Sequence, residues 1–195
     1  MTLCDQARNN RLGHRVFEDN AVAAEVAESR SFDRLLQVHS KVDHVCENLH
    51  VTLKFLGQVD EERLAALGTA LGAALSAMPR FRVELRRMGA FPSARHASVL
   101  WAWVDDIEKR LRPLVETVEA TSERLGFPRE KRELTAHVTV GRSKRGGVDA
   151  QRALDAFADR EFGGTTVEEV RVYESRLGGE GSTYVLRSRA ALASN

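Results

Sequence analysis

Two short stretches of this chain are near copies of one another, LHVTL at residues 49–53 and AHVTV at residues 136–140. Each copy has the form His-x-Thr-x with apolar residues at the x positions, and each is predicted to be a β-strand. One such pattern in a strand is most often structural. Two copies in matching strands of the two halves of one chain are far less expected by chance, so we interpret them as a functional pair.

Strand geometry gives the spacing within each copy a meaning. Successive side chains of a strand point to opposite faces of the sheet. His50 and Thr52 therefore share one face, and so do His137 and Thr139, while the apolar residues between them point to the core. Two such strands facing each other would form a cleft with two imidazoles, two hydroxyls and no carboxylate.

That set of side chains suits phosphoryl chemistry without a metal ion. An imidazole titrates at about pH 6.5, so one ring can be neutral while the other is cationic. The neutral ring can take a proton from water or a hydroxyl, and the cationic ring can protonate a leaving oxygen. Threonine hydroxyls can donate hydrogen bonds to phosphate oxygens. Two histidines without a third ligand nearby are too few for a standard zinc site, so no metal is expected.

The two motifs and their surroundings resemble the 2H phosphoesterase superfamily, and within it the RNA 2′,3′-cyclic phosphodiesterase (2′-5′ RNA ligase-like) family. The resemblance is carried by ENLHVTLKFLG at residues 47–57, GAFPS at residues 89–93 and HVTVGR at residues 137–142. It implies an α+β, bilobal, pseudo-twofold fold, in which two antiparallel sheets line a central cleft and helices lie outside. We expect residues 1–195 to form one domain, with residues 1–20 as an atypical N-terminal segment.

The resemblance also implies an activity, the metal-independent hydrolysis of RNA 2′,3′-cyclic phosphate ends to 2′-phosphomonoesters, with no cofactor. By similarity, His50 is the proton donor to the leaving 3′ oxygen and His137 is the proton acceptor that activates water. Thr52, Thr139 and Arg142 would bind the substrate. The spacing alone does not assign the two histidine roles, because the motifs are alike. By strand parity Arg142 faces away from His137, so the strand must twist or end just before it.

Two other functions stay open at this point. One is reversible ligation of RNA through a 2′-5′ bond, which shares the cyclic phosphate as its intermediate. The other is binding of RNA ends without turnover, which the unusual N-terminus suggests. The expected partners are RNA ends or nucleotides that bear a cyclic phosphate. The sequence leaves tRNA halves, oligonucleotide ends, small nucleotides and ADP-ribose cyclic phosphate open as substrates.

The composition of the 195 residues, 43% apolar and 29% charged, is typical of a soluble globular protein. A formal net charge of +1 provides no global field for nucleic acid, so any polyanion must bind to local clusters. No apolar run reaches the roughly 20 residues that span a bilayer, and no secretory signal is recognised. We therefore expect a cytoplasmic protein without membrane contact. We also expect a monomer.

The hydrophobic periodicity predicts a mixture of helices and strands that is typical of the α+β class. Helices are predicted over residues 21–42, 60–78, 105–125 and 148–160, and strands over residues 49–56, 80–88, 98–104, 134–142, 166–177 and 183–188. The family's usual first strand has the form Arg-x-Phe-x-Ala-Ile. Here Arg15, Val16 and Phe17 are followed by polar residues, so the apolar half of that strand is predicted to be missing.

Four residues near the motifs carry expectations of their own. Lys54 shares the parity of His50, and contact with phosphate and a solvated lysine are about equally expected. Phe55 has core parity, so a core position is favoured over base stacking. Trp101 and Trp103 share one face of a predicted strand and are expected to pack.

Overall fold

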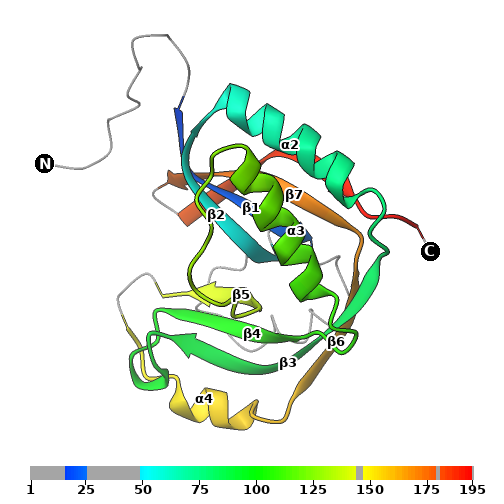
Figure 1. Ribbon diagram of the computed structural model, residues 1–195. Coiled ribbons are helices and arrows are strands. Elements are labelled where there is room, and N and C mark those ends of the chain that lie inside the picture. The colour runs from blue at the N-terminus through cyan, green and yellow to red at the C-terminus, as the bar shows by residue number, and fades with distance from the viewer. Residues whose placement is uncertain (1–15, 26–48, 144–146, 179–180, 195) are drawn as a thin grey trace, which may run out of the picture.

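The computed structural model describes residues 16–25, 49–143, 147–178 and 181–194 (Figure 1). The strands are β1 (Val16–Glu25), β2 (His50–Asp60), β3 (Phe81–Phe91), β4 (Val99–Asp105), β5 (His137–Arg142), β6 (Glu161–Val167), β7 (Glu169–Gly178) and β8 (Gly181–Ala191). The helices are α2 (Glu61–Leu75), α3 (Leu111–Arg124) and α4 (Gln151–Ala156), with the short 3₁₀ turn η2 (Ala94–His96). The α+β class is confirmed.

All eight strands belong to one antiparallel sheet, in the order β6-β3-β4-β5-β2-β1-β7-β8. Figure 1 shows that this sheet is strongly curled, with α2 and α3 packed on it. Its two central strands, β2 and β5, pair only through Val51 and Val138, which we call the seam pair. The structure therefore differs from the two expected sheets: two four-stranded halves are joined at a narrow seam.

The helix α2 covers one half of the sheet with an unbroken apolar stripe. Leu64, Leu67, Leu71 and Leu75 recur at helical spacing and are at most 3% exposed. Asp60 caps the helix, because its side chain accepts a hydrogen bond from the backbone N–H three residues later at 2.8 Å. Each buried leucine stabilises the fold by about 2 kcal/mol. No helix within the described ranges is long and apolar enough to cross a membrane.

The helix α3 covers the seam from the same side and begins later than the predicted residue 105. Asp106 caps it, since its carboxylate accepts hydrogen bonds from the backbone N–H groups of Arg110 and Leu111 at 3.0 and 2.6 Å. Pro113 lies in the first turn, where a missing N–H costs no intrahelical bond. The core face of the central strands meets this helix, and the seam pair is at most 1% exposed.

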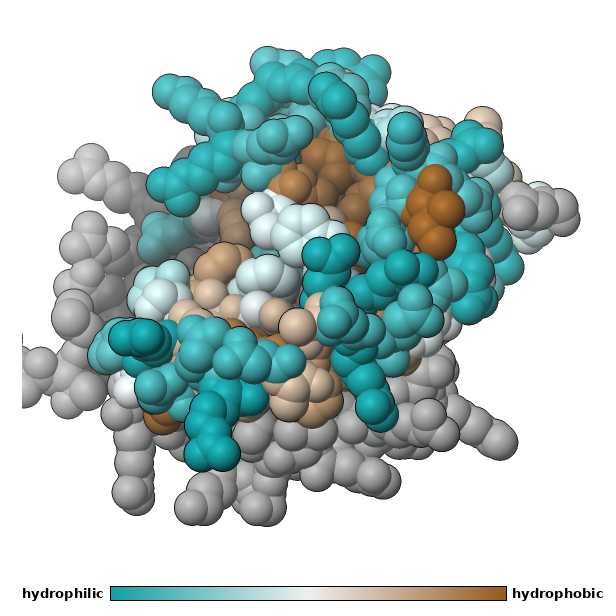
Figure 2. All heavy atoms as spheres, turned by 90° about the horizontal axis from the view of Figure 1, so that it is seen from below, coloured by the Kyte–Doolittle hydropathy of each residue, from teal (hydrophilic) through white to brown (hydrophobic). Residues whose placement is uncertain are grey.

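The short helix α4 lies beside β3, at the end of the molecule that is farthest from α2 (Figure 1). Figure 2 shows this face, where hydrophilic side chains border a recessed area in which hydrophobic residues are exposed. Strand β6 lies at the sheet edge beside β3 and was largely missed by the sequence prediction. Its Glu-Phe-Gly-Gly start has low strand propensity, and the strand forms because β3 supplies its hydrogen-bond partners.

Strand β1 corrects two expectations. Residues 21–25, predicted to begin a helix, instead complete a ten-residue strand between β2 and β7. The rest of that predicted helix, residues 26–42, lies outside the described residues. The apolar half of the strand is present, since Val22 and Ala23 are fully buried. Register shifts on both sides of Asn20 absorb the intervening polar residues, which is how one strand accommodates extra residues in an otherwise continuous ladder.

A further register shift lies in β2, directly after the first motif. Ala23 pairs with Thr52, whereas Val22 pairs with Lys54, so Leu53 has no partner in β1. An extra residue of this kind is a β-bulge, and it turns the side chains that follow it to the other face of the sheet.

This bulge exchanges the expected environments of Lys54 and Phe55. Lys54 is 3% exposed on the helix side, where its Nζ donates to Glu119 Oε2 and to the carbonyl of Pro128, both at 2.7 Å. Phe55 is turned to the opposite face and is 71% exposed. The expectations of a phosphate-contacting or solvated Lys54 and of a core Phe55 are therefore wrong, because simple alternation does not reveal a bulge.

We expect Lys54→Met to lower the free energy of unfolding by about 3–5 kcal/mol, because it leaves the carboxylate of Glu119 buried without its cation. Denaturant unfolding followed by circular dichroism measures the change. Adding Glu119→Leu to this variant should recover much of the loss, since both charges are then absent. Unchanged stability of the Lys54→Met variant would show that the buried pair contributes nothing.

A second ionic cluster links the paired strands β7 and β8 at one edge of the sheet. Burial raises the pKa of Glu174, but hydrogen bonds from Arg176 and Arg187 outweigh it, so the net pKa lies below the ordinary value of 4.5. A carboxyl group whose pKa is lowered by folding stabilises the native state above its unfolded pKa, and this contribution is lost on acidification.

We therefore expect the stability of the wild type to fall as the pH drops below about 4.5, and Glu174→Gln to make this pH dependence shallower. Urea unfolding at several pH values between neutral and acid tests this. The exposed Glu133→Gln is the matched control and should follow the wild-type curve. Parallel curves for all three proteins would contradict the assignment.

Candidate active site

The two motifs meet at the centre of the sheet, one on each side of the seam. In an antiparallel pair, the residue after one partner lies opposite the residue before the other. The register of the seam pair therefore places His50 opposite Thr139, and Thr52 opposite His137. These four side chains, which we call the quartet, are half-buried and lie on the face away from α2 and α3. The predicted parity of both motifs is confirmed.

The quartet has an approximate twofold arrangement about the seam pair. Side chains directly opposite each other in a sheet have Cβ atoms about 5 Å apart, and diagonal neighbours are about 7–8 Å apart. The two imidazoles occupy one diagonal and the two hydroxyls occupy the other. A group the size of a phosphate can therefore contact both imidazoles from opposite sides, with a hydroxyl on each remaining side.

His137 is held by its own backbone and by two aromatic rings. Its Nδ1 lies 2.7 Å from the carbonyl oxygen of Thr135. A carbonyl can only accept, so Nδ1 carries a proton and Nε2 is the nitrogen that is available for proton transfer. Phe91 and Trp101 approach the imidazole edge to face, with ring centroids 5.3 and 5.7 Å away.

His50 has two aromatic neighbours from its own half of the sheet, on strands β7 and β8. The ring of Tyr184 lies 4.9 Å away, edge to face, and that of Tyr173 lies 5.7 Å away. Each histidine of the quartet is thus flanked by two aromatic rings. Both tyrosines were missed by the sequence reasoning, because β7 and β8 carry no motif and only the sheet order brings them to the quartet.

A bulge in β5 places Arg142 on the face of the quartet. Trp101 pairs with Thr139 and Val99 pairs with Arg142, so Val140 has no partner in β4. Because Val99 and Trp101 share a face of β4, their partners share it too. The exposed Arg142 therefore lies on the side predicted for a substrate contact, and simple strand parity was misleading here.

The two bulges occur at equivalent positions of the two motifs. Each lies directly after the motif threonine, at Leu53 in the first copy and at Val140 in the second. As a result, Phe55 and Arg142 are counterparts, each three residues after a threonine of the quartet. An exposed aromatic ring and an exposed guanidinium thus lie on the quartet face of the two central strands.

The position of Trp101 depends on a glycine across the β3–β4 pair. Gly89 is its direct partner, and the indole lies so close that a Cβ at Gly89 would overlap its six-membered ring. The same indole stacks on Phe91, with ring centroids 5.1 Å apart, and contacts His137. The glycine in the GAFPS stretch therefore determines how closely the aromatic neighbours of His137 approach.

We expect Gly89→Ala to displace the indole of Trp101 and to lower the free energy of unfolding by about 1–3 kcal/mol through overpacking. Near-ultraviolet circular dichroism reports the displaced indole, and denaturant unfolding reports the stability. Gly72→Ala is the control: it lies in α2 with open space around the added methyl, and should raise stability by about 0.5–1 kcal/mol. A Gly89→Ala protein with wild-type spectrum and stability would refute this account.

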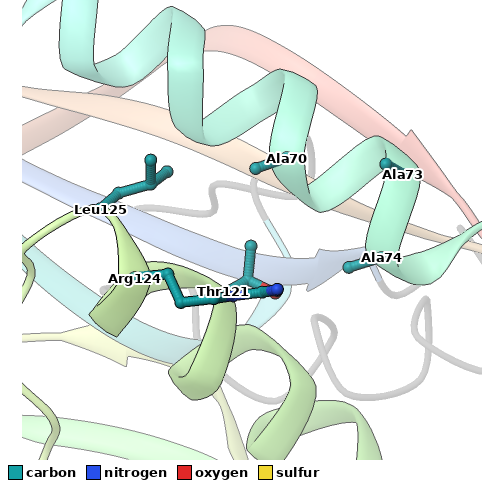
Figure 3. A pocket seen from close by; sticks show the side chains of 6 residues that line it. All are labelled: Ala70, Ala73, Ala74, Thr121, Arg124 and Leu125. Atoms are coloured by element: carbon teal, nitrogen blue, oxygen red, sulfur yellow. The ribbon is translucent and has the colours of Figure 1, made fainter.

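A hollow of about 500 Å³ lies between α2 and α3, on the side of the sheet opposite to the quartet. Figure 3 shows the alanines of α2 facing the end of α3 across it. The lining residues are Ala70, Ala73, Ala74, Thr121, Arg124 and Leu125. They include no histidine and no carboxylate, so this hollow offers none of the acid–base chemistry that the quartet provides.

Comparisons with known proteins show the family of this chain. The model of the family described as LigT like Phosphoesterase matches residues 19–101 and 103–184. The chain belongs to this family. The resemblance read from the sequence is thereby confirmed.

Two curated relatives of the family are archaeal. An RNA 2′,3′-cyclic phosphodiesterase of Aeropyrum pernix is 36% identical over 140 residues, which is 71% of this chain and 78% of that protein. An RNA 2′,3′-cyclic phosphodiesterase from Archaeoglobus fulgidus is 36% identical over 138 residues, which is 71% of this chain and 76% of that protein.

A solved structure shares the fold. The crystal structure of E. coli LigT complexed with 3′-AMP is 23% identical in sequence and has a TM-score of 0.64, with 90% of this chain and 98% of that chain covered.

Proposed function

We propose that this protein hydrolyses 2′,3′-cyclic phosphate at RNA ends to 2′-phosphomonoesters without a metal ion. The observation that carries the proposal is the quartet, in which the seam pair sets two imidazoles and two hydroxyls around one phosphate-sized space. The two archaeal relatives are named RNA 2′,3′-cyclic phosphodiesterase, which supports the proposed hydrolysis.

The proposed mechanism assigns opposite tasks to the two imidazoles. His137 takes a proton from water through Nε2, and the water oxygen attacks phosphorus. His50 gives a proton to the 3′ oxygen as the bond from phosphorus to that oxygen breaks, so the phosphate stays on the 2′ oxygen. Each such proton transfer contributes about 10²–10⁴-fold to the rate.

The surroundings of His137 support its role as the proton acceptor. Its Nδ1–H donates to the carbonyl of Thr135, which stabilises the imidazolium that forms when Nε2 accepts a proton. The diagonal arrangement of the imidazoles puts base and acid on opposite sides of phosphorus, as in-line displacement requires.

The remaining polar groups are proposed to hold the phosphate. Thr52 and Thr139 donate hydrogen bonds to its non-bridging oxygens, where negative charge increases in the transition state. Arg142 adds a charge-assisted contact from the end of β5. The aromatic rings around both histidines exclude water and lower the local dielectric constant, which strengthens these interactions.

Binding of RNA ends without turnover has lost its motivation, because β1 is a complete strand. Ligation requires only that a 5′-hydroxyl replaces water in the same step, and the assay below separates the two reactions. We further propose a single-domain monomer that acts in the cytoplasm on RNA ends or nucleotides. The continuous sheet that links both halves supports the single domain.

We expect the purified protein to convert a nucleoside 2′,3′-cyclic phosphate to the 2′-phosphate in the presence of EDTA. Phosphorus NMR distinguishes the 2′ product from the 3′ product. Adding an RNA with a 5′-hydroxyl end tests whether part of the phosphate is captured in a 2′-5′ bond. A folded protein that forms no 2′-phosphate, or that requires an added divalent metal, would disprove the proposal.

Single substitutions complete this test. His50→Ala and His137→Ala should each lower kcat by at least about 10²-fold, with circular dichroism and thermal melting close to those of the wild type. His96→Ala is the matched control, because His96 lies in η2 and packs on Gly147 outside the quartet. Full activity of either quartet variant would refute the assigned chemistry.

A further inference from the structure

Lys54 and Glu119 form a buried ion pair that the proposed mechanism does not use. Both lie on the helix side of the sheet and are at most 6% exposed, with Lys54 Nζ 2.7 Å from Glu119 Oε2. Removing two charges from water is costly, and apolar side chains of similar size could fill the same space without that cost. The pair therefore calls for a role besides stability.

The pair also binds the connection between α3 and β5, residues 125–136. Lys54 Nζ donates to the carbonyl of Pro128 at 2.7 Å, and the backbone N–H of Glu130 donates to Glu119 Oε2 at 3.4 Å. The connection contains no helix or strand, and its residues 128–133 are exposed, so apolar burial does not anchor that part. Lys54 on β2 and Glu119 on α3 thus hold the same backbone segment.

This connection ends at the group that orients His137. The carbonyl of Thr135 lies 2.7 Å from His137 Nδ1, and the next carbonyl, of Ala136, accepts from the N–H of Val104 at 3.1 Å. The hydrogen bond at one ring nitrogen of a histidine determines which nitrogen carries the proton and where the other points. The position of the connection therefore sets the direction of His137 Nε2.

The sheet alone gives the two motifs little common support. Strand β2 pairs with β1 from His50 to Asp60, whereas it pairs with β5 only through the seam pair. Figure 1 shows the connection passing from the end of α3 to β5, and the contact of Pro128 with Lys54 places it against β2. The buried ion pair is thus a second link between the first motif strand and the residues that precede the second motif.

We propose that Lys54 and Glu119 are positioning residues for His137. They hold the connection that presents the Thr135 carbonyl, and thereby keep the imidazole of the second motif aligned with the first motif. This inference rests on the proposed function, in which His137 takes a proton through Nε2. If the pair served stability alone, activity would follow stability in every variant.

The paired variant Lys54→Met/Glu119→Leu separates the two roles, because it releases the connection without leaving a buried charge unpaired. We expect a melting temperature close to that of the wild type. On adenosine 2′,3′-cyclic phosphate, kcat should fall by about tenfold to a hundredfold with KM changed less than about threefold, since a small misplacement of a proton acceptor impairs the chemical step. Wild-type kcat in this folded variant would overturn the proposal.

Glu119→Asp tests the same role with the charge retained. The side chain is one methylene shorter, so its carboxylate no longer reaches both Lys54 Nζ and the N–H of Glu130. Measured well below its melting temperature, this variant should also lose kcat at nearly unchanged KM. It decides the question if the paired variant does not fold, and wild-type kcat here would again overturn the proposal.

Arg129→Met is the matched control. Arg129 joins the same connection to the same helix, through Glu116 at 2.6 Å and Glu123 at 3.2 Å, but all three side chains are exposed. Exposed ion pairs contribute little. This variant should therefore keep wild-type kcat and KM. A loss as large as that of the paired variant would overturn the specific role of the buried pair.

A spectroscopic measurement separates this inference from the proposed hydrolysis. Nitrogen-15 NMR reports which imidazole nitrogen carries the proton, and the His137 signals are identified by their absence from His137→Ala. The wild type should show the Nδ1–H form, and the paired variant should shift toward the Nε2–H form that a free imidazole prefers. This shift in a protein without turnover would support the positioning role while the hydrolysis fails. Turnover with the same form in both proteins would overturn the positioning role alone.

Discussion

The structure depends most on the pairing of β2 with β5 through the seam pair, Val51 and Val138. This contact joins two four-stranded halves into one sheet and fixes the register of both motifs. A slip by one residue would turn every following side chain to the other face, placing imidazoles in the core and valines in the cleft. The same register therefore determines both the apolar packing of the seam pair under α3 and the arrangement of the quartet on the opposite face.

The bulges at Leu53 and Val140 adapt this symmetric frame to an asymmetric task. Each follows the threonine of its motif, and each turns the residue three positions after that threonine toward the quartet. In one half that residue is an aromatic ring, and in the other it is Arg142. The first bulge also turns Lys54 into the core, where its ion pair with Glu119 ties the motif strand to α3. One irregularity thus serves both the cleft and the core.

Much of the site could be predicted from sequence because its information is local. Histidine and threonine are two positions apart in each motif, and a strand has a period of two, so they share one face. The helix α2 was equally predictable, because its hydrophobic periodicity is a property of its own sequence. Strand β1 was not, because its small and polar residues have weak propensities and only its neighbours on both sides make it a strand.

The sequence by itself determined the duplicated motif, the face shared by each imidazole and hydroxyl, and the family to which the chain belongs. Only the tertiary structure decided that the two motifs are direct partners, that Arg142 and Phe55 turn toward the quartet, and that Trp103 stays open beside His137. The physical reason is that register and bulges are properties of strand pairs. The sequence of a single strand specifies the alternation of its side chains. It does not specify the partner strand, and a bulge exists only where one strand has an extra residue relative to its partner.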